Sequence, residues 1–181
     1  MEPVDIYVVR LDRPEAELQR LYGVLSGEER ARAGAPPFPP RKRRYVARQG
    51  ALREILARHC GVPAAQIELA RTDGGKPYVA DGGPRFSVAD SGDLALVAIA
   101  RREVGVDVEQ VRPRAAAPVG TPGFFERWTR REAAGKALGT GIGGRPGGEH
   151  ALSMSPLDVG PGFAAAVAVD GPGVRARLRT Y

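Results

Sequence analysis

Apolar and polar positions alternate over residues 102–113, a pattern typical of a β-strand. Valines stand at positions 104, 106 and 108, and acids stand at positions 107 and 109 after Gly105. Residues two apart in a strand point to the same face of a sheet. We therefore expect Asp107 and Glu109 to project together from one face, while the valines are buried on the other.

The other apolar patterns predict a mixture of strands and helices. Leucines at positions 18, 21 and 25 have helical spacing, and an apolar stripe from Tyr45 to Leu56 is typical of an amphipathic helix. Gly50 costs that helix about 1 kcal/mol, so it predicts a close backbone contact. We expect helices over 15–34, 43–61 and 124–139, and strands within 4–12, 67–79, 84–101, 104–111, 151–160 and 163–181.

The order of these elements predicts an α+β fold of two packed halves, because strands occur on both sides of a central segment. We place the boundary at residue 100. Residues 1–100 form the N-terminal α+β half, and residues 101–181 form a C-terminal α+β half that carries the acidic motifs.

Composition narrows the class of protein. The chain has 181 residues and is 43% hydrophobic, which is enough for a buried core. It contains no 18-residue apolar run, and its N-terminus lacks the profile of a signal peptide, so we expect no membrane span. The single cysteine, Cys60, excludes an internal disulfide and favours a cytoplasmic location.

The net charge of +6 suits an anionic partner, which could be nucleic acid, a phosphate compound or an acidic protein. We do not expect nucleic-acid binding, because the basic segments lack interleaved aromatic residues and any recognisable reading motif.

A group of carboxylates is the most specific chemical signal. Trp128, Glu132 and Lys136 follow one another at intervals of four, so they share a helix face. If that face packs on the strand, Glu132 joins Asp107 and Glu109. Clustered carboxylates ionise together when a cation lies among them, and oxygen ligands favour Mg²⁺. Spacing alone leaves open the alternative of a solvated acidic face paired with local arginines.

The motifs "GVDVEQVRPR" and "FERWTRREAAGKALGTGI" resemble the signature pair of the 4'-phosphopantetheinyl transferases of the Sfp type. The segments "GGKPYV", "FSVADSGDLALVAIA" and "RRYVARQGALREIL" resemble further landmarks of that family. The resemblance extends over nearly the whole chain. The residues that match the two signatures are Gly105, Asp107, Glu109, Trp128, Glu132, Lys136 and Gly139.

This resemblance implies two similar halves related by a pseudo-twofold axis, with the active site in the cleft between them. It implies a monomeric enzyme of polyketide or nonribosomal peptide biosynthesis that needs Mg²⁺. The enzyme would transfer the phosphopantetheine arm of coenzyme A to a serine of an acyl or peptidyl carrier protein. Asp107, Glu109 and Glu132 match metal ligands, Glu132 is also a candidate base, and Lys136 matches a diphosphate-binding lysine.

The resemblance also implies a coenzyme A-binding set, which comprises Arg32, Arg48, Lys76, Asp90, Ser91 and Lys136. Asp90 stands where the family has a histidine that helps to hold the 3'-phosphate. The segment from Arg114 to Phe124 is shorter than is usual in the family, and Arg131 replaces its lysine. These departures motivate two alternatives: a transferase fold with an altered substrate, or a non-catalytic module that binds carrier proteins.

Overall fold

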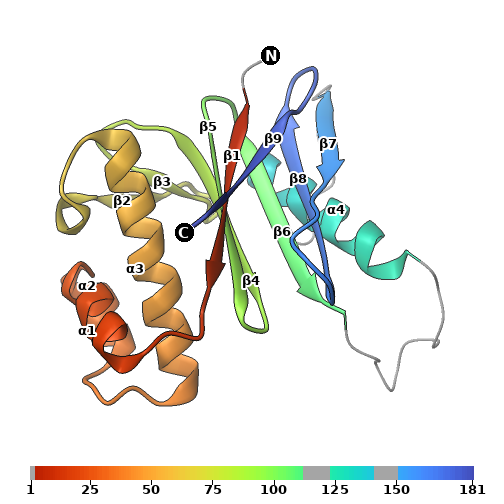
Figure 1. The fold of residues 1–181 in the computed structure, drawn as a ribbon. Coiled ribbons are helices and arrows are strands. Elements are labelled where there is room, and N and C mark those ends of the chain that lie inside the picture. The colour runs from red at the N-terminus through yellow and green to blue at the C-terminus, as the bar shows by residue number, and fades with distance from the viewer. Residues whose placement is uncertain (1–2, 112–122, 141–150) are drawn as a thin grey trace.

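The computed structural model describes residues 3–111, 123–140 and 151–181 (Figure 1). The helices are α1 (Glu15–Gly23), α2 (Gly27–Ala33), α3 (Pro40–Cys60), a short 3-10 helix (Ala64–Gln66) and α4 (Phe124–Leu138). The strands are β1 (Val4–Arg10), β2 (Leu69–Arg71), β3 (Pro77–Val79), β4 (Arg85–Ser91), β5 (Leu94–Ala100), β6 (Val104–Gln110), β7 (Leu152–Pro156), β8 (Phe163–Asp170) and β9 (Ala176–Thr180).

These strands form a four-stranded sheet, a three-stranded sheet and a small hairpin. The four-stranded sheet has the order β4-β5-β1-β9, the three-stranded sheet has the order β6-β8-β7, and β2 pairs with β3. All neighbouring strands are antiparallel except β1 and β9, which run parallel. The last strand of the chain therefore lies at the edge of the sheet that contains the first.

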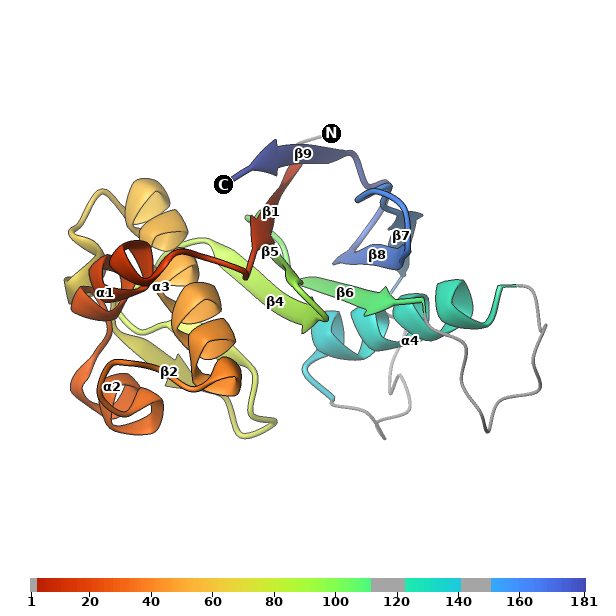
Figure 2. The ribbon, with the colours of Figure 1, turned by 60° about the horizontal axis from the view of Figure 1, so that its bottom comes forward.

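The two larger sheets pack face to face between layers of helices (Figures 1 and 2). On β1, Tyr7 and Val9 face α1 and α3, whereas Val4 and Ile6 face the three-stranded sheet. The β5 sequence "LALVAIA" is apolar at every position because both of its faces are buried. Helix α4 covers the outer face of the three-stranded sheet with small residues such as Ala133.

The predicted close contact at Gly50 is confirmed. A β-carbon at this position of α3 would lie 2.7 Å from the Leu21 β-carbon, which is too close for any side chain. Glycine therefore allows α1 to pack directly against α3, and the packing energy compensates for its poor helix propensity.

The structure confirms the α+β class that the sequence predicts. The division at residue 100 and the pseudo-twofold relation stay predictions. The shortened segment between Arg114 and Phe124 and the glycine-rich stretch after Gly139 lie largely outside the described residues.

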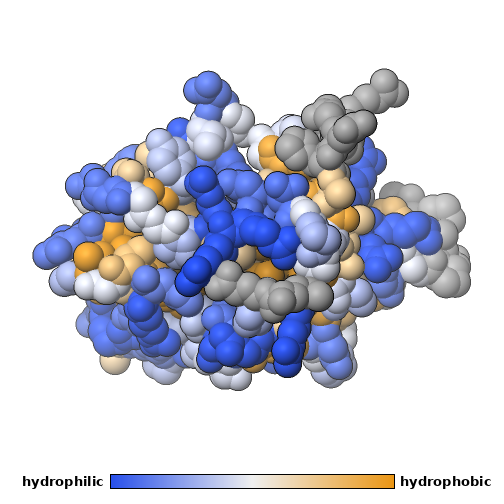
Figure 3. Space-filling model, turned by 90° about the horizontal axis from the view of Figure 1, so that it is seen from above, coloured by the Kyte–Doolittle hydropathy of each residue, from blue (hydrophilic) through white to orange (hydrophobic). Residues whose placement is uncertain are grey.

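No helix in the described ranges is long and apolar enough to cross a membrane. Seen from above, the surface is mostly hydrophilic, with smaller apolar areas between the polar side chains (Figure 3).

Candidate active site

The alternation along β6 divides its residues between the core and the candidate site, as the sequence predicts. Val104, Val106 and Val108 are buried in the core between the two sheets. Asp107 is also buried, but it lies on the opposite face of the strand, toward α4. The strand therefore holds one carboxylate at the packing boundary between a sheet and a helix.

Gly105 allows α4 to approach this face of β6. A β-carbon there would lie 1.9 Å from the Ala133 carbonyl oxygen and 2.4 Å from the Ala137 amide nitrogen. Both atoms belong to the backbone, so any larger residue would push the helix away. The glycine of the motif thus sets the distance between strand and helix.

At that distance Lys136 reaches Asp107. The Lys136 Nζ donates to Asp107 Oδ1 over 2.7 Å and to the Val106 carbonyl oxygen over 3.2 Å. The Asp107 side chain is 9% exposed and that of Lys136 is 33% exposed. Burial raises the pKa of Asp107 above its ordinary value, and Lys136 opposes this shift only in part. The negative charges of Glu109 and Glu132 raise the pKa further.

The second carboxylate oxygen of Asp107, Oδ2, has no donor beside it among the described residues. Among the described residues, Oδ2 is buried and accepts no hydrogen bond. Such an atom is costly unless a donor or a cation reaches it. Its chemistry therefore fits a hard cation such as Mg²⁺, which binds carboxylate oxygens.

Two of the three predicted metal ligands, Asp107 and Glu109, are held in separate contacts. Glu109 accepts a hydrogen bond from the Ser91 hydroxyl over 3.0 Å, while Asp107 is paired with Lys136. Over residues 3–111, 123–140 and 151–181, no three acidic, histidine or cysteine side chains gather into a metal-binding group. The shared metal site of Asp107, Glu109 and Glu132 stays a prediction.

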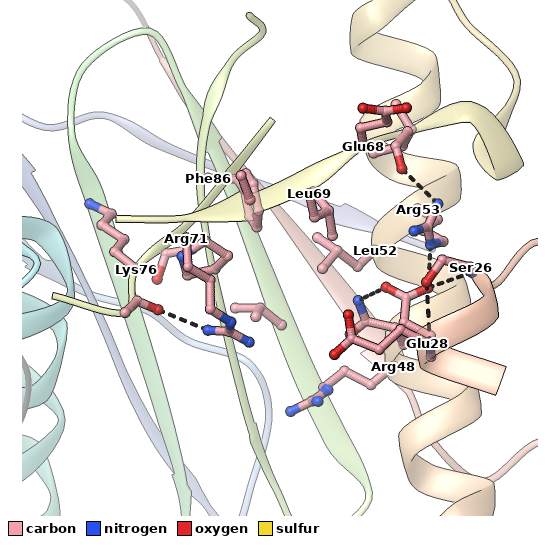
Figure 4. Close-up of a pocket in the computed structure, with 18 of the residues that line it drawn as sticks. Ser26, Glu28, Arg48, Leu52, Arg53, Glu68, Leu69, Arg71, Lys76 and Phe86 are labelled. Carbon is pink, nitrogen blue, oxygen red and sulfur yellow. Dashed lines mark hydrogen bonds and ion pairs between the residues drawn. The ribbon is translucent and has the colours of Figure 1, made fainter. Parts of the chain in front are cut away.

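A cavity of about 820 Å³ opens beside Lys136. Its wall combines residues of α2 and α3 with the β2–β3 hairpin, β4 and the C-terminal half of α4. Figure 4 shows Arg48 and Arg53 on the helical side, and Arg71 and Lys76 on the hairpin side. The cavity is therefore bordered by cationic side chains from segments that are far apart in the sequence.

The structure brings four of the predicted coenzyme A-binding residues to this cavity, namely Arg32, Arg48, Lys76 and Lys136. Lys76 donates to Glu103 over 2.6 Å and to the Ala137 carbonyl oxygen over 2.8 Å, so it also ties the hairpin to the end of α4. Arg32 pairs with Glu28 on the surface of α2.

The other two predicted residues, Asp90 and Ser91, are not part of the cavity wall. Asp90 pairs with Arg48 over 2.7 Å. The Ser91 hydroxyl donates to Glu109 and accepts from the Gln110 amide over 3.0 Å, which attaches β4 to β6. Roles of these two residues in binding a cofactor stay predictions.

Sequence reasoning missed a buried ion pair in the cavity wall. Arg53 Nε donates to Glu29 over 2.5 Å, and Nη1 donates to the carbonyl oxygens of Ala64 and Ile67. Burial alone would raise the pKa of Glu29. Hydrogen bonds from Arg53, the Ser26 amide and Gln49 outweigh burial, so the pKa lies below its ordinary value.

Arg71 was also missed, although it lines the cavity and donates to the Gly75 carbonyl oxygen over 2.8 Å. One local signal was available for the ion pair: Ser26 and Glu29 have the spacing of a capping box, which the structure shows at the start of α2. For Arg53 and Arg71 the sequence offers no comparable signal.

No family model matches the chain. The chain is 34% identical to the 4'-phosphopantetheinyl transferase HetI of Nostoc sp., and the match covers 78% of this chain and 70% of that protein. It is 31% identical to a putative 4'-phosphopantetheinyl transferase of Synechocystis sp., covering 77% and 66%. A 4'-phosphopantetheinyl transferase of Bacillus subtilis is 27% identical over 60% of this chain and 50% of its own length.

Proposed function

Because the chain belongs to the 4'-phosphopantetheinyl transferase family, we propose that it transfers phosphopantetheine from coenzyme A to a carrier-protein serine. The acceptor would be an acyl or peptidyl carrier protein, and the reaction would need Mg²⁺. The observation that carries this proposal is the position of Lys136. It lines the cavity, whose wall also carries Arg48, Arg71 and Lys76, and it contacts Asp107, whose Oδ2 accepts no hydrogen bond among the described residues.

The reaction joins the serine oxygen to the phosphorus next to the pantetheine arm. The bond from that phosphorus to the bridging diphosphate oxygen breaks, and adenosine 3',5'-bisphosphate leaves with the electron pair. We propose that Glu132 takes the serine proton, directly or through a water molecule. Lys136 would bind the diphosphate and offset the charge that develops on the leaving phosphate.

Asp107, Glu109 and Glu132 are the residues that would hold Mg²⁺. The ion would neutralise diphosphate oxygens and orient them for attack. Support comes from Oδ2 of Asp107, which is buried and accepts no hydrogen bond among the described residues.

We further propose that the site lies in the cleft between the halves 1–100 and 101–181. The cavity supports this proposal because Arg48 and Lys76 come from the first part, and Lys136 and Gly139 from the second. We also propose that the protein is a monomer, that it acts in the cytoplasm, and that it serves polyketide or nonribosomal peptide biosynthesis.

The test is mass spectrometry of an apo carrier protein after incubation with the chain, coenzyme A and Mg²⁺. We expect the carrier to gain the mass of one phosphopantetheine group, and Asp107→Ala to abolish the gain. Asp93→Asn is the matched control, because Asp93 pairs with Arg10 on the surface and should retain activity. No gain with any of several carrier proteins, or full activity of Asp107→Ala, would contradict the proposal.

A further inference from the structure

An ion pair at the cavity wall neutralises one of its arginines. Arg48 on α3 lines the cavity, and its Nη1 donates to Oδ1 of Asp90 on β4 over 2.7 Å. The Arg48 side chain is 29% exposed and that of Asp90 is 36% exposed. Both groups are thus accessible to water, and to an anion that approaches the cavity.

The Arg48 guanidinium is held in position by two neighbours and retains an unused donor. Its central carbon lies 5.8 Å from the ring centroid of Tyr45, and Asp90 holds Nη1. Among the described residues, Nε is buried and has no hydrogen-bond partner. The geometry is that of an anion-binding arginine whose charge is already matched by a carboxylate of the same chain.

Asp90 therefore competes with any phosphate that binds at Arg48. The phosphate must either displace the carboxylate or remain next to it at a cost in repulsion. The competing carboxylate is attached to the protein, so it is present at a high local concentration however dilute the protein is. An ion pair with this exposure is weak enough to be exchanged.

We propose that Asp90 is a specificity-determining residue that occupies Arg48 and lowers the affinity of the cavity for phosphate groups. The consequence for the donor rests on the proposed function: coenzyme A should be bound with little preference over dephospho-coenzyme A, which has one phosphate fewer. Removing the carboxylate frees Arg48 and should restore that preference.

The test uses four variants and a phosphate probe that does not depend on the proposed reaction. Asp90→Asn removes the charge but keeps the shape. Asp93→Asn makes the same charge change in the same hairpin, but its partner is Arg10 over 3.5 Å, away from the cavity. Arg48→Gln and the double variant Arg48→Gln/Asp90→Asn show whether the effect passes through Arg48.

Pyrophosphate binding, measured by calorimetric titration at fixed ionic strength, decides the inference. We expect Asp90→Asn to bind pyrophosphate about tenfold more tightly than the parent. Asp93→Asn should change affinity by less than about twofold, and the gain should vanish in the Arg48→Gln background. The inference is overturned by any of three results: no measurable binding to Asp90→Asn, an equal gain in Asp93→Asn, or a gain that persists without Arg48.

Titration with coenzyme A and dephospho-coenzyme A then tests the application to the donor. We expect Asp90→Asn to favour coenzyme A by about tenfold more than the parent does. If Asp90→Asn gains affinity for pyrophosphate while no variant binds coenzyme A, the role of Asp90 holds and the proposed donor is wrong. If the parent already strongly prefers coenzyme A and Asp90→Asn leaves this preference unchanged, Asp90 does not set specificity.

Discussion

Two carboxylates near the cavity, the partly buried Glu29 on α2 and the buried Asp107 on β6, differ in the direction of their pKa shifts. Each has one basic partner, Arg53 for Glu29 and Lys136 for Asp107. Burial raises the pKa of both carboxylates. Hydrogen bonds outweigh burial at Glu29, whose pKa lies below its ordinary value, but the contact with Lys136 does not outweigh burial at Asp107, whose pKa lies above its ordinary value. The two carboxylates differ in the number of donors that each receives, and Asp107 alone has acidic neighbours, Glu109 and Glu132, that raise its pKa further.

Glu29 is fully satisfied, because Arg53, Gln49 and the Ser26 amide donate to its two oxygens. Asp107 receives its donor on Oδ1 alone, and Oδ2 receives none among the described residues. A saturated carboxylate stabilises a fold, whereas an unsaturated one retains the ability to bind something else. Glu29 is thus part of the scaffold of the cavity, whereas Asp107 keeps one buried oxygen that accepts no hydrogen bond among the described residues.

The largest effect on stability should follow from breaking the saturated pair. Arg53→Met leaves Glu29 buried without its cationic partner and should cost about 3–5 kcal/mol, since the side chains are only 3% and 12% exposed. Urea unfolding measures the loss. The matched control is Arg32→Met, which removes an arginine from an exposed pair and should cost less than about 1 kcal/mol. Equal costs for the two variants would mean that Glu29 is not held by Arg53.

A smaller effect, opposite in sign for the two carboxylates, is expected from pH. Because the pKa of Glu29 is lowered, the charged carboxylate stabilises the folded protein at pH values above 4.5, the ordinary pKa of a glutamate. This stabilisation is lost as the pH falls through the folded-state pKa. The raised pKa of Asp107 means that the folded protein binds a proton more tightly than the unfolded chain. Its charge therefore destabilises the protein as pH rises from the ordinary value of 3.8 through the folded-state pKa.

The pair of variants Glu29→Gln and Asp107→Asn separates these signs when both are unfolded in urea, with chelator present, from about pH 3 to pH 7. Relative to the parent, Glu29→Gln should become less stable as pH rises, and Asp107→Asn should become more stable. If the stabilities of the two variants relative to the parent changed in the same direction with pH, the opposite pKa shifts of Glu29 and Asp107 would be contradicted.

The smallest effect concerns the cap of α2. The Ser26 hydroxyl accepts from the Glu29 amide over 3.2 Å, so Ser26→Ala should cost about 1 kcal/mol. The control is Ser155→Ala on β7, where the hydroxyl donates, among the described residues, only to the next carbonyl oxygen, so its loss should be close to neutral. Thermal unfolding of both variants measures the difference. A cost for Ser26→Ala no larger than for Ser155→Ala would show that the cap does not support Glu29.

Local patterns predicted much of the fold and part of the candidate site. The period-two pattern of β6 predicted which face Asp107 occupies, and Gly50 predicted the close approach of two helices. The pairing of β9 with β1 had no such signal, because it joins residues more than 170 positions apart. Strand pairing over such a separation depends on how the whole chain packs, not on periodicity within a window.

The sequence by itself determined the elements, the faces of β6 and the family to which the motifs belong, because periodicity and motif spacing are local properties. Only the tertiary structure decided which charges pair. Arg48 meets Asp90 across 42 positions, and Lys136 meets Asp107 across 29. Coulomb energy depends on the distance and burial of charges in three dimensions, and a linear pattern contains neither quantity. The same acidic side chains could have faced solvent, received donors on both oxygens, or been buried with one oxygen lacking a donor. The packing of α4 and α3 against the sheets decides which of these environments each carboxylate has.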